Sequence, residues 1–282
     1  MIKIEFKEPD TVEWLEWREK CKAKIDELIE FVKQGNSPSE IITDLYKERA
    51  IKKKYYINTK ESPFWGKCAY CETHVDQYGD IDHFRPARAV TDQDDKPIVI
   101  DGPHGQVKHP GYYWLAYDCM NLLPSCEECN RPSTLGEKKI GKHCRFPVRN
   151  TRALSPGEEI NEEPLLINPI IDNPETHFKL NVETGILGSL TDRGKTCIDI
   201  FGLNERDPLR HARRSAYRAA KALLVELINS NDETDVKKCI RELCEIIVGK
   251  TPYAIAGREA IKKIPGLYEQ LAGTYCNTAT DI

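Results

Sequence analysis

Two Cys-x-x-Cys pairs decide the fold of this chain: CAYC at residues 68–71 and CEEC at residues 126–129. Four thiolates in two such pairs are the ligand set of a tetrahedral structural zinc site, because each pair forms a tight turn that points both sulfur atoms at one ion. The separation between the pairs is longer than in the usual zinc ribbon, so a redox dithiol and unrelated cysteines are the alternatives. We predict that one Zn²⁺ ion is shared by Cys68, Cys71, Cys126 and Cys129.

The stretch GDIDHFRP at residues 79–86 lies between the two pairs. Its alternating apolar residues predict a strand, which Pro86 ends. A carboxylate beside an imidazole suits a magnesium-type ion on Asp82 and proton abstraction by His83. Taken alone, the dipeptide is more typical of a histidine that makes a structural hydrogen bond.

Two asparagines complete the pattern, since Asn121 begins the segment before the second cysteine pair and Asn130 directly follows that pair. The order C-x-x-C, Asp-His, Asn-Leu, C-x-x-C-Asn over residues 64–149 resembles the HNH endonucleases. The resemblance implies an α+β fold in which a ββα-metal nuclease core, supported by a structural zinc, is flanked by helices. It also implies a catalytic Mg²⁺ or Mn²⁺ ion and a hydrolase that cuts phosphodiester bonds.

The resemblance assigns a role to each of four residues. His83 would be the general base that activates water, and Asp82 would be a ligand of the catalytic divalent ion. Asn121 would brace the loop that carries the base, and Asn130 would be a second metal ligand. The most familiar HNH pattern has histidine at that last position, but an amide oxygen is an acceptable ligand for a hard cation. His143 is the alternative donor.

Short segments around these motifs resemble one particular group within the HNH endonucleases. The segments CAYCE, DHFRP, YYWLAY, RFPV and LINP are similar to a bacterial HNH group over roughly residues 64–220. That group includes the nuclease subunit of Septu-type anti-phage systems, which works with an ABC-like ATPase partner and also occurs beside some retrons. The similarity implies an effector nuclease of antiviral defence. The N-terminal helices or the C-terminal bundle would be its docking surface for the ATPase.

The formal net charge of −4 excludes a uniformly basic nucleic-acid-binding shell. Residues 131–152 nevertheless form a basic strip of the kind that binds a phosphate backbone. DNA is the favoured substrate and RNA, including tRNA, is the alternative, because lysine and arginine do not distinguish the two polymers. The contacts predicted in this strip are Arg131, Lys138, Lys139, Lys142 and Arg145. The basic stretches Lys47–Lys54 and Arg206–Arg218 are either solvated helix faces or further contact surfaces.

The chain has 282 residues, which we divide into three segments. An N-terminal helical segment is predicted at residues 1–61 and a nuclease domain at residues 62–150, with a surface insertion at about 91–110. Residues 151–282 are predicted to form a mostly helical C-terminal domain. The N-terminus lacks the apolar core of a signal peptide and no segment is apolar enough to span a membrane, so we expect a cytoplasmic protein. In that compartment, clustered cysteines indicate metal binding.

Local signals also predict individual elements. Asp10 opens a helix that ends at Gly35, and Ser37 opens a second helix. A hairpin is predicted at about 178–187. Later helices are predicted from Thr191 to Gly202, from Asp207 onward, at about 235–248 and at about 253–271.

Three other functions explain part of the pattern. A stand-alone restriction-type endonuclease would need its own base-reading motif, and none is recognisable. A non-catalytic zinc-ribbon module that binds nucleic acid would keep the cysteines and the basic strip, but it would not need Asp82, His83 and Asn121 together. A protein-interaction scaffold explains the smallest part of this pattern of residues. The joint presence of those three residues favours an enzyme.

Overall fold

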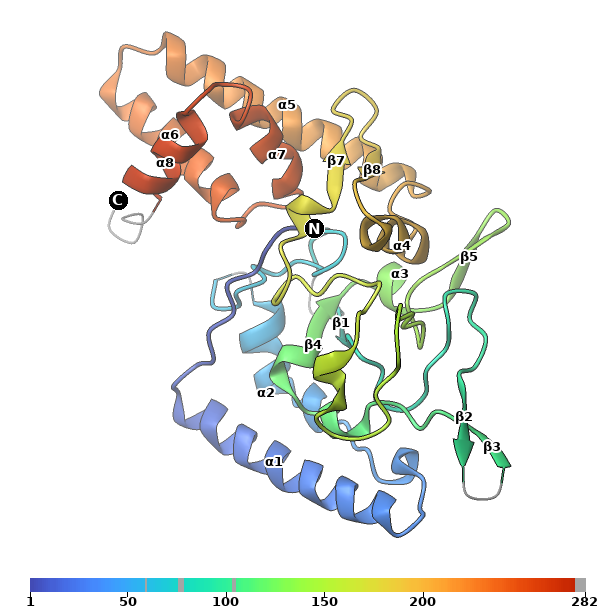
Figure 1. Ribbon diagram of the computed structural model, residues 1–282. Helices are drawn as coiled ribbons and strands as arrows, with labels where there is room; N and C mark the ends of the chain where they lie inside the picture. The colour runs from blue at the N-terminus through green and yellow to red at the C-terminus, as the bar shows by residue number, and fades with distance from the viewer. Residues whose placement is uncertain (59, 76–78, 103–104, 277–282) are drawn as a thin grey trace.

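The computed structural model describes residues 1–58, 60–75, 79–102 and 105–276. Near its centre, β1 (Asp80–His83) pairs antiparallel with β4 (Leu122–Ser125), and the short helix α3 (Glu127–Asn130) follows directly (Figure 1). The register sets His83 opposite Leu122. The motif that contains Asp82 and His83 and the segment that enters the second cysteine pair are therefore adjacent strands.

The N-terminal segment contains one long helix, α1 (Val12–Lys33), instead of the two that were predicted. Thr11 and not Asp10 is its N-cap, and its hydroxyl accepts a hydrogen bond from the amide of Trp14. The helix predicted from Ser37 does not form, because the Ser37 hydroxyl bonds to Ser39 instead of capping the backbone. Single 3-10 turns at Pro38–Glu40 and Leu45–Lys47, α2 (Arg49–Ile51) and a π-helical turn at Lys52–Ile57 take its place.

Two exposed hairpins extend from the central part of the chain. Strands β2 (Val99–Gly102) and β3 (Gly105–Lys108) form one of them, inside the stretch predicted as a surface insertion. Strands β5 (Ser133–Leu135) and β6 (Lys138–Ile140) form the other, directly after α3. Further 3-10 turns lie at Tyr113–Leu115, Cys119–Asn121, Glu158–Asn161 and Pro174–Thr176.

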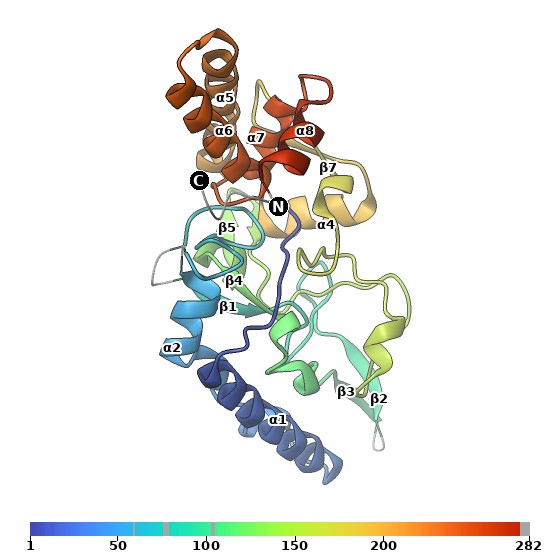
Figure 2. The same cartoon turned by 90° about the vertical axis from the view of Figure 1, so that its left-hand side faces the viewer.

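The C-terminal part is mostly helical and begins with the predicted hairpin, β7 (Phe178–Leu180) and β8 (Leu187–Ser189). The helices that follow are α4 (Asp192–Phe201), α5 (Asp207–Asn229), α6 (Glu233–Ile247), α7 (Ala254–Ile261) and α8 (Leu267–Thr274). The last two were predicted as one helix. Pro265 cannot continue a helix and Gly266 has a φ of +76°, so the helix breaks there. Helices α5 to α8 pack together at one end of the molecule (Figure 2).

The apolar core joins the three predicted segments. One continuous cluster of buried side chains runs from Met1 and Trp14, through Tyr70 and Leu122, to Ala256. A second, smaller cluster lies within α5 to α8. The central strands thus stand inside the main core, which fixes the residues on them. Each described helix is either too short or too polar to cross a bilayer.

Candidate active site and metal centre

The two cysteine pairs converge at one point. All four thiols are buried, and their sulfur atoms lie within 4.8 Å of one another. The Sγ atoms of Cys71 and Cys126 are 3.6 Å apart. Four sulfur atoms placed 2.3 Å from a tetrahedral zinc ion would be about 3.8 Å apart. The cluster therefore has the donor chemistry and the size to hold a metal ion such as zinc. The other seven cysteines lie elsewhere, and Cys144 and Cys276 are only partly buried.

Arg206 covers this cysteine cluster. Its guanidinium group donates to Cys129 Sγ at 3.2 Å and contacts Cys126 Sγ at 3.8 Å. Burial disfavours the charge of Arg206, yet the neighbouring sulfur atoms raise its pKa above the ordinary value. Hydrogen bonds from the other three cysteines lower the pKa of the Cys71 thiol. A cation at this place would balance the negative charge that four thiolate ligands bring to a metal ion. No local pattern indicates this role, because Arg206 lies far from the cysteines in the chain.

His83 has a defined protonation pattern. Its Nε2 atom lies 2.8 Å from the carbonyl oxygen of Ala116. A carbonyl oxygen only accepts hydrogen bonds, so Nε2 carries the proton and Nδ1 of the neutral ring is left as an acceptor. Burial lowers the pKa of His83 to about 4, so the ring is neutral at pH 7. The ring of Tyr46 packs edge-on against it, with the ring centroids 4.5 Å apart. A neutral imidazole with an unprotonated ring nitrogen is the state that a general base requires.

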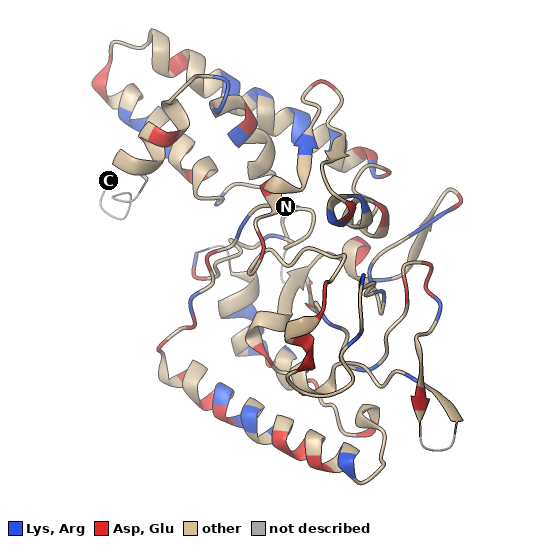
Figure 3. Ribbon diagram, viewed as in Figure 1, with Lys and Arg blue, Asp and Glu red and all other residues tan. Residues whose placement is uncertain are grey.

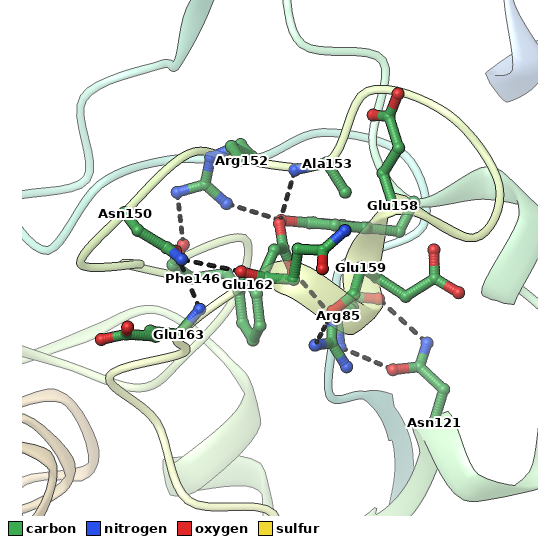
Figure 4. A network of polar contacts seen from close by, with 12 residues as sticks. Arg85, Asn121, Phe146, Asn150, Arg152, Ala153, Glu158, Glu159, Glu162 and Glu163 are labelled. Carbon is green, nitrogen blue, oxygen red and sulfur yellow. Dashed lines mark hydrogen bonds and ion pairs between the residues drawn. The ribbon is translucent and has the colours of Figure 1, made fainter.

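The Asn121 side chain forms hydrogen bonds with two backbone segments beside His83. Its Oδ1 accepts a hydrogen bond from the backbone amide of Arg85 at 2.7 Å. Its Nδ2 donates to the carbonyl oxygens of Arg85 and Leu115, each at 3.0 Å, and Figure 4 shows the contacts between Asn121 and Arg85. One side chain thus links the loop after β1 to the turn that ends beside Ala116.

A network of hydrogen bonds and ion pairs around Glu162 holds the loop that contains Arg85, as Figure 4 shows. Arg85 Nε donates to Glu162 Oε2 at 2.9 Å, and the other oxygen of Glu162 accepts from the Tyr112 hydroxyl at 2.5 Å. The same oxygen accepts from the amide of Ala153 at 2.8 Å. Arg152 in turn donates to the Tyr112 hydroxyl. No local sequence pattern predicts this network, because its members lie far apart in the chain.

Asp82 and Asn130, the predicted ligands of a divalent ion, do not meet at an open position. The Asp82 side chain is buried, and its carboxylate accepts from the Tyr70 hydroxyl at 2.5 Å. The ammonium group of Lys142 lies 3.1 Å from its oxygen atoms. The side-chain amide of Asn130 donates to Asp80 at 3.0 Å. Because a cation already stands at Asp82, this donor set does not suit a divalent ion as it stands.

His143, the alternative metal donor, has a positive φ of +49°. Its Nε2 atom faces Cys144 Sγ at 3.9 Å. Its backbone amide donates to the carbonyl oxygen of Asn130 at 2.7 Å, so the segment that contains it is held against α3.

The predicted basic strip is only partly a surface. The expectation for Lys142 and Arg145 is wrong, because their exposed fractions are 0% and 6%. The guanidinium group of Arg145 instead donates to the carbonyl oxygens of Gly141 and Ile200. Three of the five predicted contacts are exposed, namely Arg131, Lys138 and Lys139. Of these, Arg131 forms ion pairs with Asp80 and Glu127, and Lys138 forms ion pairs with Asp199 and Glu205.

The basic stretch at residues 47–54 also lies near His83. Tyr46 contacts the His83 ring, and the positive charges of Lys142, Arg88 and Lys47 contribute to the lowered pKa of His83 after the larger effect of burial. The segment 47–54 therefore stands beside the site. Figure 3 shows lysine and arginine on this segment and along α5. In α5, Arg213 is buried and donates to the carbonyl oxygens of Gly185 and Leu203, so it is not a contact surface.

Three curated relatives share sequence with the chain. It is 37% identical over 185 residues to the Septu protein PtuB of Bacillus mycoides strain KBAB4, which covers 63% of the chain and 53% of the relative. It is 27% identical over 199 residues to a Septu protein PtuB of Bacillus thuringiensis, which covers 64% and 57%. It is 28% identical over 241 residues to the Septu protein PtuA of Bacillus mycoides strain KBAB4, which covers 81% and 31%.

The chain thus spans about half the length of the PtuB proteins that it matches. No protein-family model matches the chain, and no solved structure matches it either. The predicted likeness to Septu-type proteins is confirmed by these relatives. Their names state membership of a Septu system and no chemical activity.

Proposed function

We propose that this chain is the nuclease of a Septu-type anti-phage defence system and hydrolyses phosphodiester bonds, with DNA as the favoured substrate. The observation that carries the proposal is the state of His83, which is neutral and keeps Nδ1 as an acceptor. His83 also stands in the order strand, strand, short helix that the HNH resemblance implies. The Septu relatives support the defence role.

In this proposal His83 acts as the general base. Its Nδ1 takes a proton from water while the water oxygen attacks phosphorus. The bond from phosphorus to the 3′ oxygen breaks as the new bond forms, and the 3′ oxygen takes a proton from solvent. The products are a 3′ hydroxyl and a 5′-phosphate, as in the enzymes that the chain resembles. The Ala116 carbonyl holds the ring in the productive tautomer and stabilises the imidazolium that forms. Asn121 keeps the two segments around the ring in place.

Two metals belong to the proposal. Zn²⁺ in the cysteine cluster would have a structural role, because all four ligands are cysteines and the cluster is buried. Mg²⁺ or Mn²⁺, as the cofactor of hydrolysis, would neutralise charge on the phosphate. The predicted ligands Asp82 and Asn130 do not suit that ion in the present arrangement, so no step is assigned to it.

A protein partner is also part of the proposal. The segment of PtuA that is similar to this chain makes up only 31% of that protein. In PtuA, a segment of this kind is therefore covalently joined to a larger one. We expect a related larger protein, such as an ABC-like ATPase, to act with this chain.

The test is cleavage by the purified protein. Plasmid DNA and RNA would be incubated with Mg²⁺ or Mn²⁺, with and without the cognate ATPase. Wild type would be compared with His83→Ala and with His211→Ala, an exposed histidine on α5 that serves as the matched control. Zinc content would be measured in all three proteins.

We expect wild type and His211→Ala to cut and His83→Ala to lose about 10²- to 10⁴-fold in rate. Cleavage by His83→Ala at the wild-type rate would show that the proposal is wrong. So would a zinc-loaded wild type that cuts neither polymer under any of these conditions.

The same assay separates the alternatives. RNA cleavage alone would indicate an RNA- or tRNA-cutting nuclease of the same fold. DNA cleavage that needs no partner would favour a stand-alone restriction-type enzyme. Binding of nucleic acid without cleavage would indicate a non-catalytic zinc module.

A further inference from the structure

Lys142 is a buried lysine that the proposed mechanism does not use. Its side chain is 0% exposed. The Nζ atom lies 3.1 Å from the carboxylate of Asp82 and 2.6 Å from the carbonyl oxygen of His83. Removing an ammonium group from water is costly unless a charge partner and further hydrogen bonds replace the water. Here Asp82 is the charge partner and His83 provides a second acceptor.

The backbone holds Lys142 firmly in this place. Its amide donates to the carbonyl oxygen of Cys129 at 2.7 Å, and the amide of Gly141 donates to Ile200 at 2.9 Å. Gly141 has a φ of +86°, and a Cβ atom there would lie 1.8 Å from the carbonyl oxygen of Arg131. Only glycine is compatible with that approach. The second cysteine pair and α4 thus fix the residue that presents the ammonium group.

Asp80, two residues before Asp82, is also paired with a cationic side chain. Asp80 and Asp82 alternate along β1 and therefore point to the same face of the strand. Asp80 pairs with Arg131 at 3.1 Å, and Asp82 pairs with Lys142. Two carboxylates on one face would attract a divalent cation. In this arrangement, cationic side chains of the chain itself neutralise both.

We propose that the ammonium group of Lys142 is the resident cation of Asp82, and that a divalent cation reaches this carboxylate only by displacing it. The inference rests on the proposed function in one respect, because that function supplies the reason for a divalent ion to enter. It assigns Lys142 the role of setting the affinity of the site for metal. Lys142 is a positioning residue here, since it acts through Asp82.

The first test measures Mn²⁺ binding to the zinc-loaded protein in the absence of nucleic acid, by calorimetry or by the paramagnetic resonance signal of free Mn²⁺. Lys142→Met removes the charge and keeps an unbranched side chain that is one atom shorter. Lys139→Met, at an exposed lysine three positions earlier, is the matched control. The double variant Asp82→Asn, Lys142→Met removes the carboxylate as well.

We expect Lys142→Met to bind Mn²⁺ at least about tenfold more tightly than wild type, because the competing charge is gone. Lys139→Met should bind as wild type does, and the double variant should lose the gain. The inference is overturned if Lys142→Met binds no more tightly, or if the gain persists without the Asp82 carboxylate.

The second test uses the wild type, because Lys142→Met leaves Asp82 without its charge partner and can fail to fold. An amine-reactive acylating reagent would label lysines, with mass spectrometry as the readout and Lys139 as the internal reference. We expect Lys142 to be protected without Mn²⁺ and labelled at saturating Mn²⁺. Continued protection of Lys142 while Mn²⁺ fills a site that depends on Asp82 would refute the inference.

These measurements are independent of cleavage. A protein that behaves as expected toward Mn²⁺ but cuts no nucleic acid would refute the proposed function and leave this inference standing. If the protein cuts nucleic acid in a His83-dependent way but Lys142→Met leaves its Mn²⁺ affinity unchanged, only the inference is refuted.

Discussion

The Nε2 atom of His83 lies 2.8 Å from the Ala116 carbonyl, and this contact decides which nitrogen of the ring is free. His83 was predicted as the base because the order of the motifs around it resembles the HNH endonucleases. The sequence could not predict the carbonyl partner, because Ala116 lies 33 residues further along the chain. Lys142 was predicted to be exposed for the same reason. A count of charges does not reveal a partner that is 60 residues away.

Asn121 makes three hydrogen bonds with the backbone of the loop and turn beside His83. Asn121→Ala removes all three bonds, and only the Leu115 carbonyl keeps another donor, the Asp118 amide, so we expect the variant to lower the free energy of unfolding by roughly 2–4 kcal/mol. The cleavage rate should fall by about tenfold or more, because the base loses its alignment. Urea unfolding and the plasmid assay would measure the two effects. Asn229→Ala, at an exposed position on α5, should change stability by less than about 0.5 kcal/mol.

His109 is buried and uses both ring nitrogens, since Nε2 donates to the Ala153 carbonyl and Nδ1 accepts from the Gly111 amide. Burial lowers the pKa of His109 below its ordinary value of 6.5. The unfolded chain therefore binds the proton more readily, so the stabilisation is complete above about pH 6.5 and is lost as the pH falls. We expect the free energy of unfolding to drop between pH 7 and pH 5. His109→Gln cannot titrate and should show a shallower drop in the same denaturation series; an equal slope would contradict the assignment.

At the scale of elements, the sequence predicted helices correctly where residues typical of helix starts stand at the N-terminal end. Thr191 accepts from the amide of Gly194 at 3.1 Å and starts α4, as predicted. The long helix predicted from Asp207 is α5, with proline in its first turn. Local signals failed over residues 38–57, where Tyr46, Tyr55 and Tyr56 are buried against the rest of the molecule. Packing of these rings overrides the helical preference of that segment.

The link between β6 and Lys142 depends on Gly141, whereas Gly136 in the β5–β6 turn faces open space. Gly141→Ala places a Cβ atom against the Arg131 carbonyl, so we expect a loss above about 3 kcal/mol in the free energy of unfolding. Gly136→Ala also has a positive φ, but it meets nothing and should cost only about 1–2 kcal/mol. Thermal unfolding of the two variants would compare them. Equal losses would show that the contact at Gly141 is not the cause.

At the scale of the whole molecule, the cysteine cluster and the Asp82 site are one structure. The first cysteine pair contains Tyr70, which donates to Asp82, and the second pair holds the backbone of Lys142 through Cys129. The sequence predicted the cysteine cluster, whose spacing is a local pattern. It could not show that both pairs also determine the partners of Asp82, which depends on the tertiary fold.

Removal of zinc should therefore act on the centre of the molecule first. A structural zinc ion contributes on the order of 10 kcal/mol to folding, so a strong chelator should expose residues 62–150 to protease. Helices α5 to α8 have an apolar cluster of their own and should resist longer. Limited proteolysis followed by mass spectrometry would show the order of cleavage. Simultaneous cleavage of residues 62–150 and of α5 to α8 would contradict this order of unfolding. Lys142 should also become reactive to acylation when zinc is removed.

The main core also determines when the site can exist during synthesis. Ile4 bonds to the Pro169 carbonyl, Tyr70 stacks on Phe201, and Arg206 reaches Cys129. A ribosome adds these partners late, since Pro169, Phe201 and Arg206 all follow the second cysteine pair in the chain. A nascent chain therefore carries the early motif for a long time without the surroundings that organise it. If the chain cuts nucleic acid, this late closure keeps the growing polypeptide harmless to the messenger RNA and the chromosome beside it.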